Sequence, residues 1–170
     1  MTKIFRSIKA ETINDNPFKL METDWTLVTA GTMESLNTMT AAWGGMGVLW
    51  HRKVAFIYVR PTRHTFQFME KSDRFTLTFF AEEHREILNF CGKKSGRNTN
   101  KIKETGLIPV LSENGGIYFE QARLVLDCRK IYFQDVAPAN FLDARIHTEY
   151  PLKDYHRLYI GEIVNCLVAD

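Results

Sequence analysis

The segment from Val59 to Thr65 carries two arginines where an apolar run ends and a short helix is expected. A helix N-terminus presents free backbone N–H groups and a partial positive charge, and both favour an anion. Arg60 and Arg63 can add bidentate hydrogen bonds to a phosphate, and the Thr65 hydroxyl can donate one more. From these residues alone an alternative stays open, in which both arginines are solvated and Thr62 caps the helix.

A second segment, from Lys93 to Lys101, is a basic loop that leads into another expected helix start. It holds four cations and no acid, although the net charge of the whole chain is only +2. Such a loop offers many hydrogen-bond donors to an anion. A mobile, solvated surface loop is the alternative interpretation.

The third segment, from Leu36 to Gly44, combines small residues with a tryptophan. Small side chains let a flat ring approach the backbone, whose N–H and C=O groups can then bind heteroatoms on the ring edge. Trp43 could cover such a ring or belong to the hydrophobic core. Together the three segments indicate a site for one phosphorylated, planar ligand.

The elements that must position these segments are mostly strands. Phe75, Leu77 and Phe79 alternate with threonines between Arg74 and Phe80, which is the period of a strand. Residues 122–128 alternate in the same way, and residues 54–59 form an apolar run typical of a strand buried on both faces. Weaker strand patterns cover residues 25–30, 37–43, 117–119 and 158–168.

Helical patterns are few. Residues 82–90 open with acids and place an apolar stripe before Gly92, which predicts a helix ending at that glycine. A shorter helix is expected after Pro61, and Asn98 is expected to cap a brief turn that ends before Gly106. Many strands with a few short helices predict a mainly β fold, a closed antiparallel barrel with helices attached.

Length and composition exclude several classes of protein. The chain has 170 residues, which suits one domain, and 22 basic against 20 acidic residues leave too little charge to favour nucleic acid or a membrane surface. No stretch has the roughly 20 apolar residues of a spanning helix. Cys91, Cys128 and Cys166 have neither metal-ligand nor disulfide spacing, which indicates reduced thiols in a cytoplasmic protein. No metal-ligand set and no catalytic nucleophile is predicted.

Four stretches of the sequence, in series, resemble the flavin reductase-like family, specifically its flavoredoxin-type members. They are NTMTAAWGG, VAFIYVRPTRHTFQFMEKSDRFTLTFF, NFCGKKSGRNTNKIKETGL and DYHRLYIGEIV. The resemblance runs from about Trp25 to Val164 and implies an FMN-binding split β-barrel, a closed antiparallel Greek-key barrel. Residues 1–170 would then form a single domain, with residues 1–24 as an N-terminal extension of it.

The resemblance also implies which residues bind FMN. The residues that match the segment along the isoalloxazine ring are Asn37, Met39, Thr40, Ala41, Ala42 and Trp43. Those that match the turn contacting the phosphate and ribityl chain are Arg60, Arg63 and Thr65. Those that match the loop completing the phosphate site are Ser95, Gly96, Arg97 and Lys101. His156 matches a histidine near the ring. The family often has serine in place of Ala42 and aspartate in place of Asn98 or Thr99.

The activity implied is that of an FMN-dependent oxidoreductase, which transfers hydride from NAD(P)H to bound FMN and on to free flavin or another acceptor. The alternative is a flavoredoxin-like electron-transfer protein with little NAD(P)H activity and an electron-acceptor protein as partner. Family members are homodimers with the flavin close to the subunit interface, so a homodimer is expected. A third hypothesis is a barrel-shaped binding module without redox chemistry, although the near-neutral charge disfavours it. In it, nucleic-acid bases would stack on the aromatic residues Phe66, Tyr118, Tyr132 and Phe133.

Overall fold

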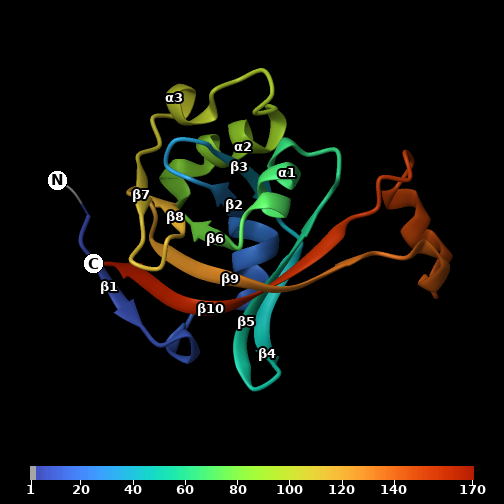
Figure 1. Cartoon of the computed structure of the whole chain (residues 1–170), viewed down its shortest axis with the longest axis horizontal. Helices are drawn as coiled ribbons and strands as arrows, with labels where there is room; N and C mark the ends of the chain where they lie inside the picture. Colours follow the sequence, from blue (N-terminus) through green and yellow to red (C-terminus); the bar gives the residue numbers. More distant parts are fainter. Residues whose placement is uncertain (1–2) are drawn as a thin grey trace.

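The computed structural model describes residues 3–170 and is built around one large antiparallel sheet (Figure 1). The strands of its main path run in the order β3-β2-β6-β9-β10-β5-β4, and β1 pairs with β10. These strands are β1 (Phe5–Ile8), β2 (Thr26–Gly31), β3 (Leu36–Ala41), β4 (Gly44–Leu49), β5 (Arg52–Val59), β6 (Arg74–Phe79), β9 (Leu124–Asp135) and β10 (Arg157–Ala169). A small second sheet pairs β7 (Pro109–Leu111) with β8 (Ile117–Phe119).

The three α-helices are short and lie together at the top of Figure 1. The α-helices are α1 (His64–Lys71), α2 (Arg85–Lys93) and α3 (Lys101–Thr105). A π-helical turn, η2 (Lys19–Asp24), and four 3-10 turns complete the elements: η1 (Ala10–Thr12), η3 (Glu82–His84), η4 (Pro138–Asn140) and η5 (Ala144–Glu149). The last two turns lie in the segment between β9 and β10, residues 136–156, which extends away from the rest of the molecule (Figure 1). We call this segment the arm. No helix in the described part of the chain is long and apolar enough to cross a membrane.

The mainly β fold with a few short helices is confirmed, but the ladder of paired strands does not close. β3 and β4 stand at the two ends of the strand path. Only Ala42 and Trp43 separate these strands in the chain, and the Tyr58 N–H donates to the Trp43 carbonyl at 3.2 Å. The chain therefore turns directly from β3 into β4 at the position where a closed barrel would have two paired strands. An open ladder of this kind is typical of a split barrel.

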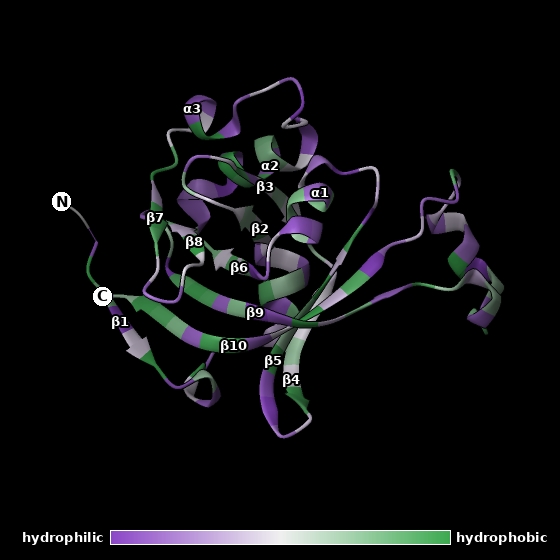
Figure 2. Cartoon of the chain, viewed as in Figure 1, coloured by the Kyte–Doolittle hydropathy of each residue, from purple (hydrophilic) through white to green (hydrophobic). Residues whose placement is uncertain are grey.

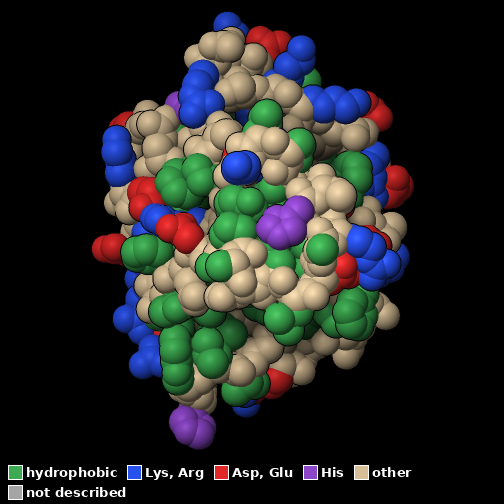
Figure 3. Space-filling model, turned by 90° about the vertical axis from the view of Figure 1, so that its right-hand side faces the viewer, with side chains coloured by type: hydrophobic (Ala, Val, Ile, Leu, Met, Phe, Trp, Pro, Cys, Tyr) green, Lys and Arg blue, Asp and Glu red, His purple; other side chains and the backbone are tan. Residues whose placement is uncertain are grey.

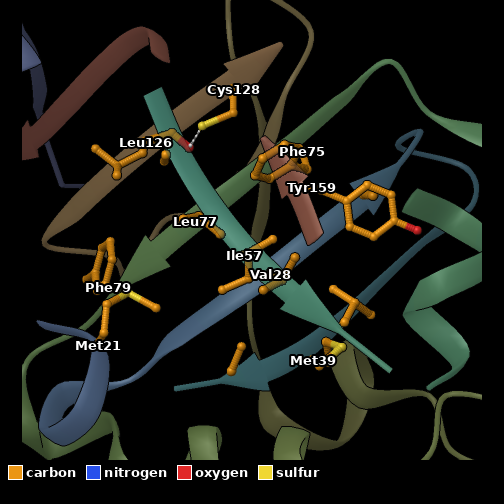
Figure 4. Packing of buried hydrophobic residues seen from close by; sticks show 14 of the residues in the cluster. Met21, Val28, Met39, Ile57, Phe75, Leu77, Phe79, Leu126, Cys128 and Tyr159 are labelled. Atoms are coloured by element: carbon orange, nitrogen blue, oxygen red, sulfur yellow. Dashed lines mark hydrogen bonds between the residues drawn. The ribbon is translucent and has the colours of Figure 1, made fainter. Parts of the chain in front are cut away.

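The core lies inside the curved sheet and follows the alternation read in the sequence (Figure 4). Phe75, Leu77 and Phe79 of β6 are each no more than 1% exposed. The N-terminal residues pack on this barrel too: β1 pairs with β10, and Met21 of η2 lies in the same cluster. Burial of apolar side chains contributes roughly 25 cal/mol of stabilising free energy per Å² of surface, and it is the main term that stabilises the fold.

Three expectations about individual elements are wrong. Residues 54–59 are not buried on both faces, because Phe56 and Tyr58 point away from the core and are only half-buried. Helix α2 does not end at Gly92 but continues to Lys93; a Cβ at Gly92 would lie 3.4 Å from the Thr40 side chain, so this glycine permits close packing on β3. Asn100, not Asn98, caps α3, and Gly106 ends it with a φ of 69°.

Candidate functional site

Thr65 and Ser95, thirty residues apart in sequence, line one hollow of about 130 Å³ within a single chain. This cationic hollow lies between the N-terminus of α1 and the loop after α2. That loop is predominantly hydrophilic, as the top of Figure 2 shows. The hollow is lined by Thr62, Arg63, His64, Thr65, Gly92, Lys93, Lys94, Ser95, Gly96, Arg97 and Lys101. No carboxylate is among these lining residues, so the donor set suits an anion.

The back of the cationic hollow is held together by Asn37 of β3. Its Nδ2 donates to the Thr65 Oγ1 at 2.7 Å, which leaves the Thr65 hydroxyl hydrogen free to be donated elsewhere. A Cβ at Gly96 would lie 2.1 Å from the Asn37 Oδ1 and 2.9 Å from the His64 Cδ2. Only glycine therefore lets this loop come so close to β3. Asn37 therefore lies behind the cationic hollow. It does not line the second hollow, described below, whose wall includes residues 39–43 of the same segment.

Lys101 is a buried lysine whose ammonium group is held by two backbone carbonyls. Its side chain is nearly buried, and its Nζ donates to the Thr38 and Cys91 carbonyls, each at 2.8 Å. Burial lowers the pKa of this lysine to about 8. Lys101 thus ties β3 to α2, and its charge adds to the field of the cationic hollow.

Arg63 and Arg97 present the more available cations. The Arg97 Nη1 donates to the Thr62 carbonyl at 3.0 Å. The Arg63 guanidinium has no hydrogen bond or ion pair with any residue of the described range 3–170, although it is half-buried. Burial and the nearby charge of Arg60 lower the pKa of Arg63. A half-buried cation without a carboxylate partner is suited to an anionic ligand.

A second hollow, of about 220 Å³, adjoins the first at Arg63. We call it the aromatic hollow; it is lined by Met39, Thr40, Ala41, Ala42, Trp43, Tyr58, Arg60, Arg63 and His156. Trp43 is 44% exposed and its ring lies 5.0 Å from that of His156, so the core interpretation of this tryptophan is wrong. Backbone and small side chains of residues 39–42 form one wall, as a flat ligand requires.

His156 is held in the aromatic hollow by Tyr150. The Tyr150 hydroxyl lies 2.8 Å from the His156 Nδ1. Burial raises the pKa of Tyr150, so the phenol keeps its proton at neutral pH. Burial, together with the charge of Arg60, lowers the pKa of His156 to about 4. The imidazole is therefore neutral at pH 7.

Arg60 lines the aromatic hollow but not the cationic one. Its Nη1 pairs with the Asp154 carboxylate at 2.9 Å, its Nη2 donates to the Glu149 carbonyl at 2.8 Å, and its guanidinium lies 5.0 Å from the Tyr150 ring centroid. The Arg60 side chain is therefore engaged by protein groups rather than free in solvent, and it does not line the cationic hollow. The helix-capping interpretation of Thr62 is also wrong, because Arg63 occupies the N-cap position of α1 without a side-chain cap.

Sequence reasoning missed several residues of the site. Tyr58 lines the aromatic hollow from the outward face of β5, and the alternation of that strand contains the signal for it. Tyr150 and Asp154 come from the arm, and no local pattern marks them. His64 stands at the first position of α1, beside both Gly96 and Arg97, within a segment singled out for its arginines.

The buried histidine predicts a pH dependence of stability. The pKa of His156 is about 4 when folded against an ordinary 6.5, so the unfolded chain binds more protons between these values. Stability from this group is complete above pH 6.5 and is lost as the pH falls toward 4, on the order of 3 kcal/mol. Urea unfolding at pH 7 and 4.5 measures it.

In His156→Gln the loss of stability between these two pH values should be smaller. His147→Gln, which removes an exposed histidine of the arm, is the matched control. Equal acid sensitivity in wild type and His156→Gln would show that this histidine does not titrate as described.

The chain is a mainly β split barrel in which a cationic hollow opens beside an aromatic one. The chain belongs to the flavin reductase-like family: the family profile described as "Flavin reductase like domain" matches residues 18–170. Comparison with curated protein sequences found no match.

Three solved structures illustrate the shared fold. An FMN-binding domain of a flavin reductases-like enzyme from Shewanella baltica OS155 aligns with a TM-score of 0.70 at 16% identity, over 99% of this chain and 78% of that one. The flavoredoxin of Desulfovibrio vulgaris (Miyazaki F) gives 0.67 at 21%, over 97% and 76%. The NADH:FAD oxidoreductase of Streptomyces globisporus gives 0.64 at 16%, over 86% and 81%.

Proposed function

We propose that this chain is an FMN-binding oxidoreductase that takes hydride from NAD(P)H and passes reducing equivalents to free flavin or another acceptor. The observation that carries the proposal is the shared cationic hollow, in which Thr65 and Ser95 meet beside an aromatic hollow. Family membership and the FMN-binding neighbours support FMN as the cofactor.

The residues present fit a flavin phosphate. Arg63, Arg97 and the hydroxyls of Thr65 and Ser95 supply charged and neutral donors in a hollow that no acid lines. A phosphate monoester dianion needs such a set, because its buried charge must be both neutralised and hydrogen-bonded. Lys101 contributes charge while its Nζ holds the two carbonyls behind the hollow.

FMN, once bound, supplies the redox chemistry, so the chain needs no nucleophile or metal of its own. The backbone of residues 39–43 would orient the flat ring, and Trp43 would shield it from water. The neutral His156, held by its hydrogen bond with Tyr150, would line the part of the hollow that receives the ring. Orientation of this kind lowers the barrier to a transfer between two bound partners.

Steady-state oxidation of NADH and NADPH by the FMN-loaded protein tests this proposal, with several free flavins as acceptors. Turnover well above that of free FMN supports it. The absence of turnover with either nicotinamide and every flavin would contradict the reductase activity.

An electron carrier is the second candidate, because flavoredoxins from Methanosarcina acetivorans and Desulfovibrio vulgaris are among the similar structures. Both functions require the same residues to bind FMN. A carrier would show slow nicotinamide oxidation but fast electron exchange with a protein acceptor. Stopped-flow mixing with a reduced iron–sulfur protein distinguishes the two.

We further propose that the chain acts as a homodimer in the cytoplasm. Figure 3 shows hydrophobic side chains across the centre and lower part of one face, with Lys and Arg along its upper edge. Apolar residues that are more than half exposed include Val48, Trp50, Phe133, Leu142 and Leu152, and a second copy would cover such residues. The three cysteines are free and buried, which supports a reducing compartment. Sedimentation measures the oligomeric state.

A further inference from the structure

His64 is an ionisable residue of the cationic hollow to which the proposed function assigns no role. It is the first residue of α1, the helix that lies at the top of Figure 1 together with α2 and α3. A Cβ at Gly96 would lie 2.9 Å from the His64 Cδ2, so the imidazole packs closely on the loop that lines the hollow. A proton on this ring would therefore add a charge to the wall of the hollow.

The other charged residues that line the cationic hollow are all cations. They are Arg63, Lys93, Lys94, Arg97 and Lys101. His64 also borders a neighbouring hollow of about 410 Å³, which adds no further charged side chain among residues 3–170. Burial, and then the charges of Arg97 and Lys101, lower the pKa of His64. The N-terminus of α1 adds partial positive charge. In the absence of an anion, the imidazole is therefore neutral at pH 7.

A phosphate dianion in the cationic hollow would reverse this balance. An opposite charge close to a histidine favours the protonated ring. That ring can donate a charge-assisted hydrogen bond to a phosphate oxygen. The Gln67 Nε2 lies 2.7 Å from the His64 Nδ1. Because a side-chain amide offers both a donor and an acceptor, Gln67 can pair with this nitrogen whether or not it carries a proton. Gln67 therefore does not hold the ring in one protonation state.

We propose that His64 takes up one proton from solvent when a flavin phosphate enters the cationic hollow, so that FMN binds more tightly as the pH falls through about 7. The step is a simple protonation: the neutral imidazole gains one proton and becomes an imidazolium, and no bond to the flavin forms. This inference rests on the proposed function, since FMN must bind in the hollow for its phosphate to meet His64.

Other titratable groups near the site respond at different pH values. Burial lowers the pKa of Lys101 to about 8, so protons that this lysine gains from a nearby phosphate are gained mainly at pH 8 and above. The pKa of His156 is about 4, so its imidazole stays neutral near pH 7. A free phosphate monoester gains its proton near pH 6, about equally in every variant. Measurements between pH 6.5 and 7.5 therefore report mainly on His64.

Calorimetric titration of FMN into the FMN-free protein tests the proposal. At pH 7, two buffers with different ionisation enthalpies give the number of protons taken up, which should be roughly half to one per FMN in wild type. The Kd for FMN should fall roughly 3- to 6-fold from pH 7.5 to pH 6.5.

Two variants of His64 remove the proton and keep different parts of the side chain. His64→Gln keeps a polar group, and His64→Phe keeps a ring against Phe68, whose centroid lies 5.3 Å from that of His64. Both should show a net proton uptake near zero at pH 7, and their Kd should change less than about 2-fold between pH 6.5 and 7.5. Circular dichroism of the FMN-free variants shows whether each one folds.

His84→Gln is the matched control. His84 is also half-buried and also packs edge-on against a phenylalanine, with its ring centroid 5.9 Å from that of Phe80. It lines neither the cationic hollow nor its neighbour. This variant should take up the same number of protons as wild type.

Riboflavin, which lacks the phosphate, is the ligand control. Any riboflavin binding should be equal in wild type and His64→Gln at both pH values. A riboflavin affinity that depends on pH as strongly as the FMN affinity would show that the proton does not respond to the phosphate, and would overturn the inference.

Wild-type proton uptake in a folded His64→Gln or His64→Phe protein also overturns the inference, while FMN binding and the proposed function stand. If FMN binds at neither pH, the proposed function fails first, and the inference fails with it.

Discussion

Replacing Arg63 with glutamine is expected to weaken FMN binding roughly 10- to 100-fold, since a charge-assisted hydrogen bond is worth about 1.5–3 kcal/mol. Arg63 lines both the cationic and the aromatic hollow, and its guanidinium has no partner within residues 3–170. The substitution removes a half-buried, unpaired cation, so the Tm of the FMN-free protein should not fall. Quenching of FMN fluorescence measures the Kd, and circular dichroism the Tm.

Arg60→Gln is the matched control from the same turn. Arg60 is paired with Asp154 and lies over Tyr150, so its removal should lower the Tm by releasing the arm, with a smaller effect on FMN affinity. The reverse pattern, in which Arg60→Gln loses FMN and Arg63→Gln retains it, would show that Arg60 rather than Arg63 is the arginine that binds the cofactor.

Replacing Gly96 with alanine should cause the second large effect, a combined loss of stability and of FMN binding. The new Cβ would lie 2.1 Å from the Asn37 Oδ1, so the loop or the amide must move. Overpacking of this kind costs about 1–3 kcal/mol. The shift would also break the 2.7 Å hydrogen bond from Asn37 that orients the Thr65 hydroxyl. Chemical denaturation and FMN titration measure the two effects separately.

Gly47→Ala provides the control, because a Cβ at this position of β4 meets nothing within 4 Å. That variant should match wild type in stability and in FMN affinity. A Gly96→Ala protein as stable and as tight-binding as Gly47→Ala would contradict the close contact between the loop and β3.

The strands and the convergence of the site could largely be predicted from the sequence. The alternation of apolar and polar residues in residues 74–80 and 122–128 is a local property and is typical of a strand. β6 and β9 confirm both strands, although the polar residues Thr76, Thr78 and Asp127 are buried as well. The basic loop and the arginine-rich turn were each ambiguous alone. Their joint match to one family predicted that they meet, and Thr65 and Ser95 do line one hollow.

The partners of individual side chains could not be predicted, because they depend on residues far along the chain. Arg60 pairs with Asp154 across 94 positions, and the Lys101 Nζ reaches the Thr38 carbonyl across 63. The sequence pattern predicts a helix stop at Gly92, whereas the lack of a side chain there permits close packing against Thr40. A glycine required for close approach and one required for a turn look the same in sequence.

A crystal structure of the protein with FMN bound tests the central claim most directly. The account predicts one flavin per chain, with its phosphate in hydrogen-bond contact with both the Thr65 segment and the Ser95 loop and its ring against residues 39–43. A flavin whose phosphate touches neither segment, or a protein that takes up no FMN at saturating concentration, would contradict it.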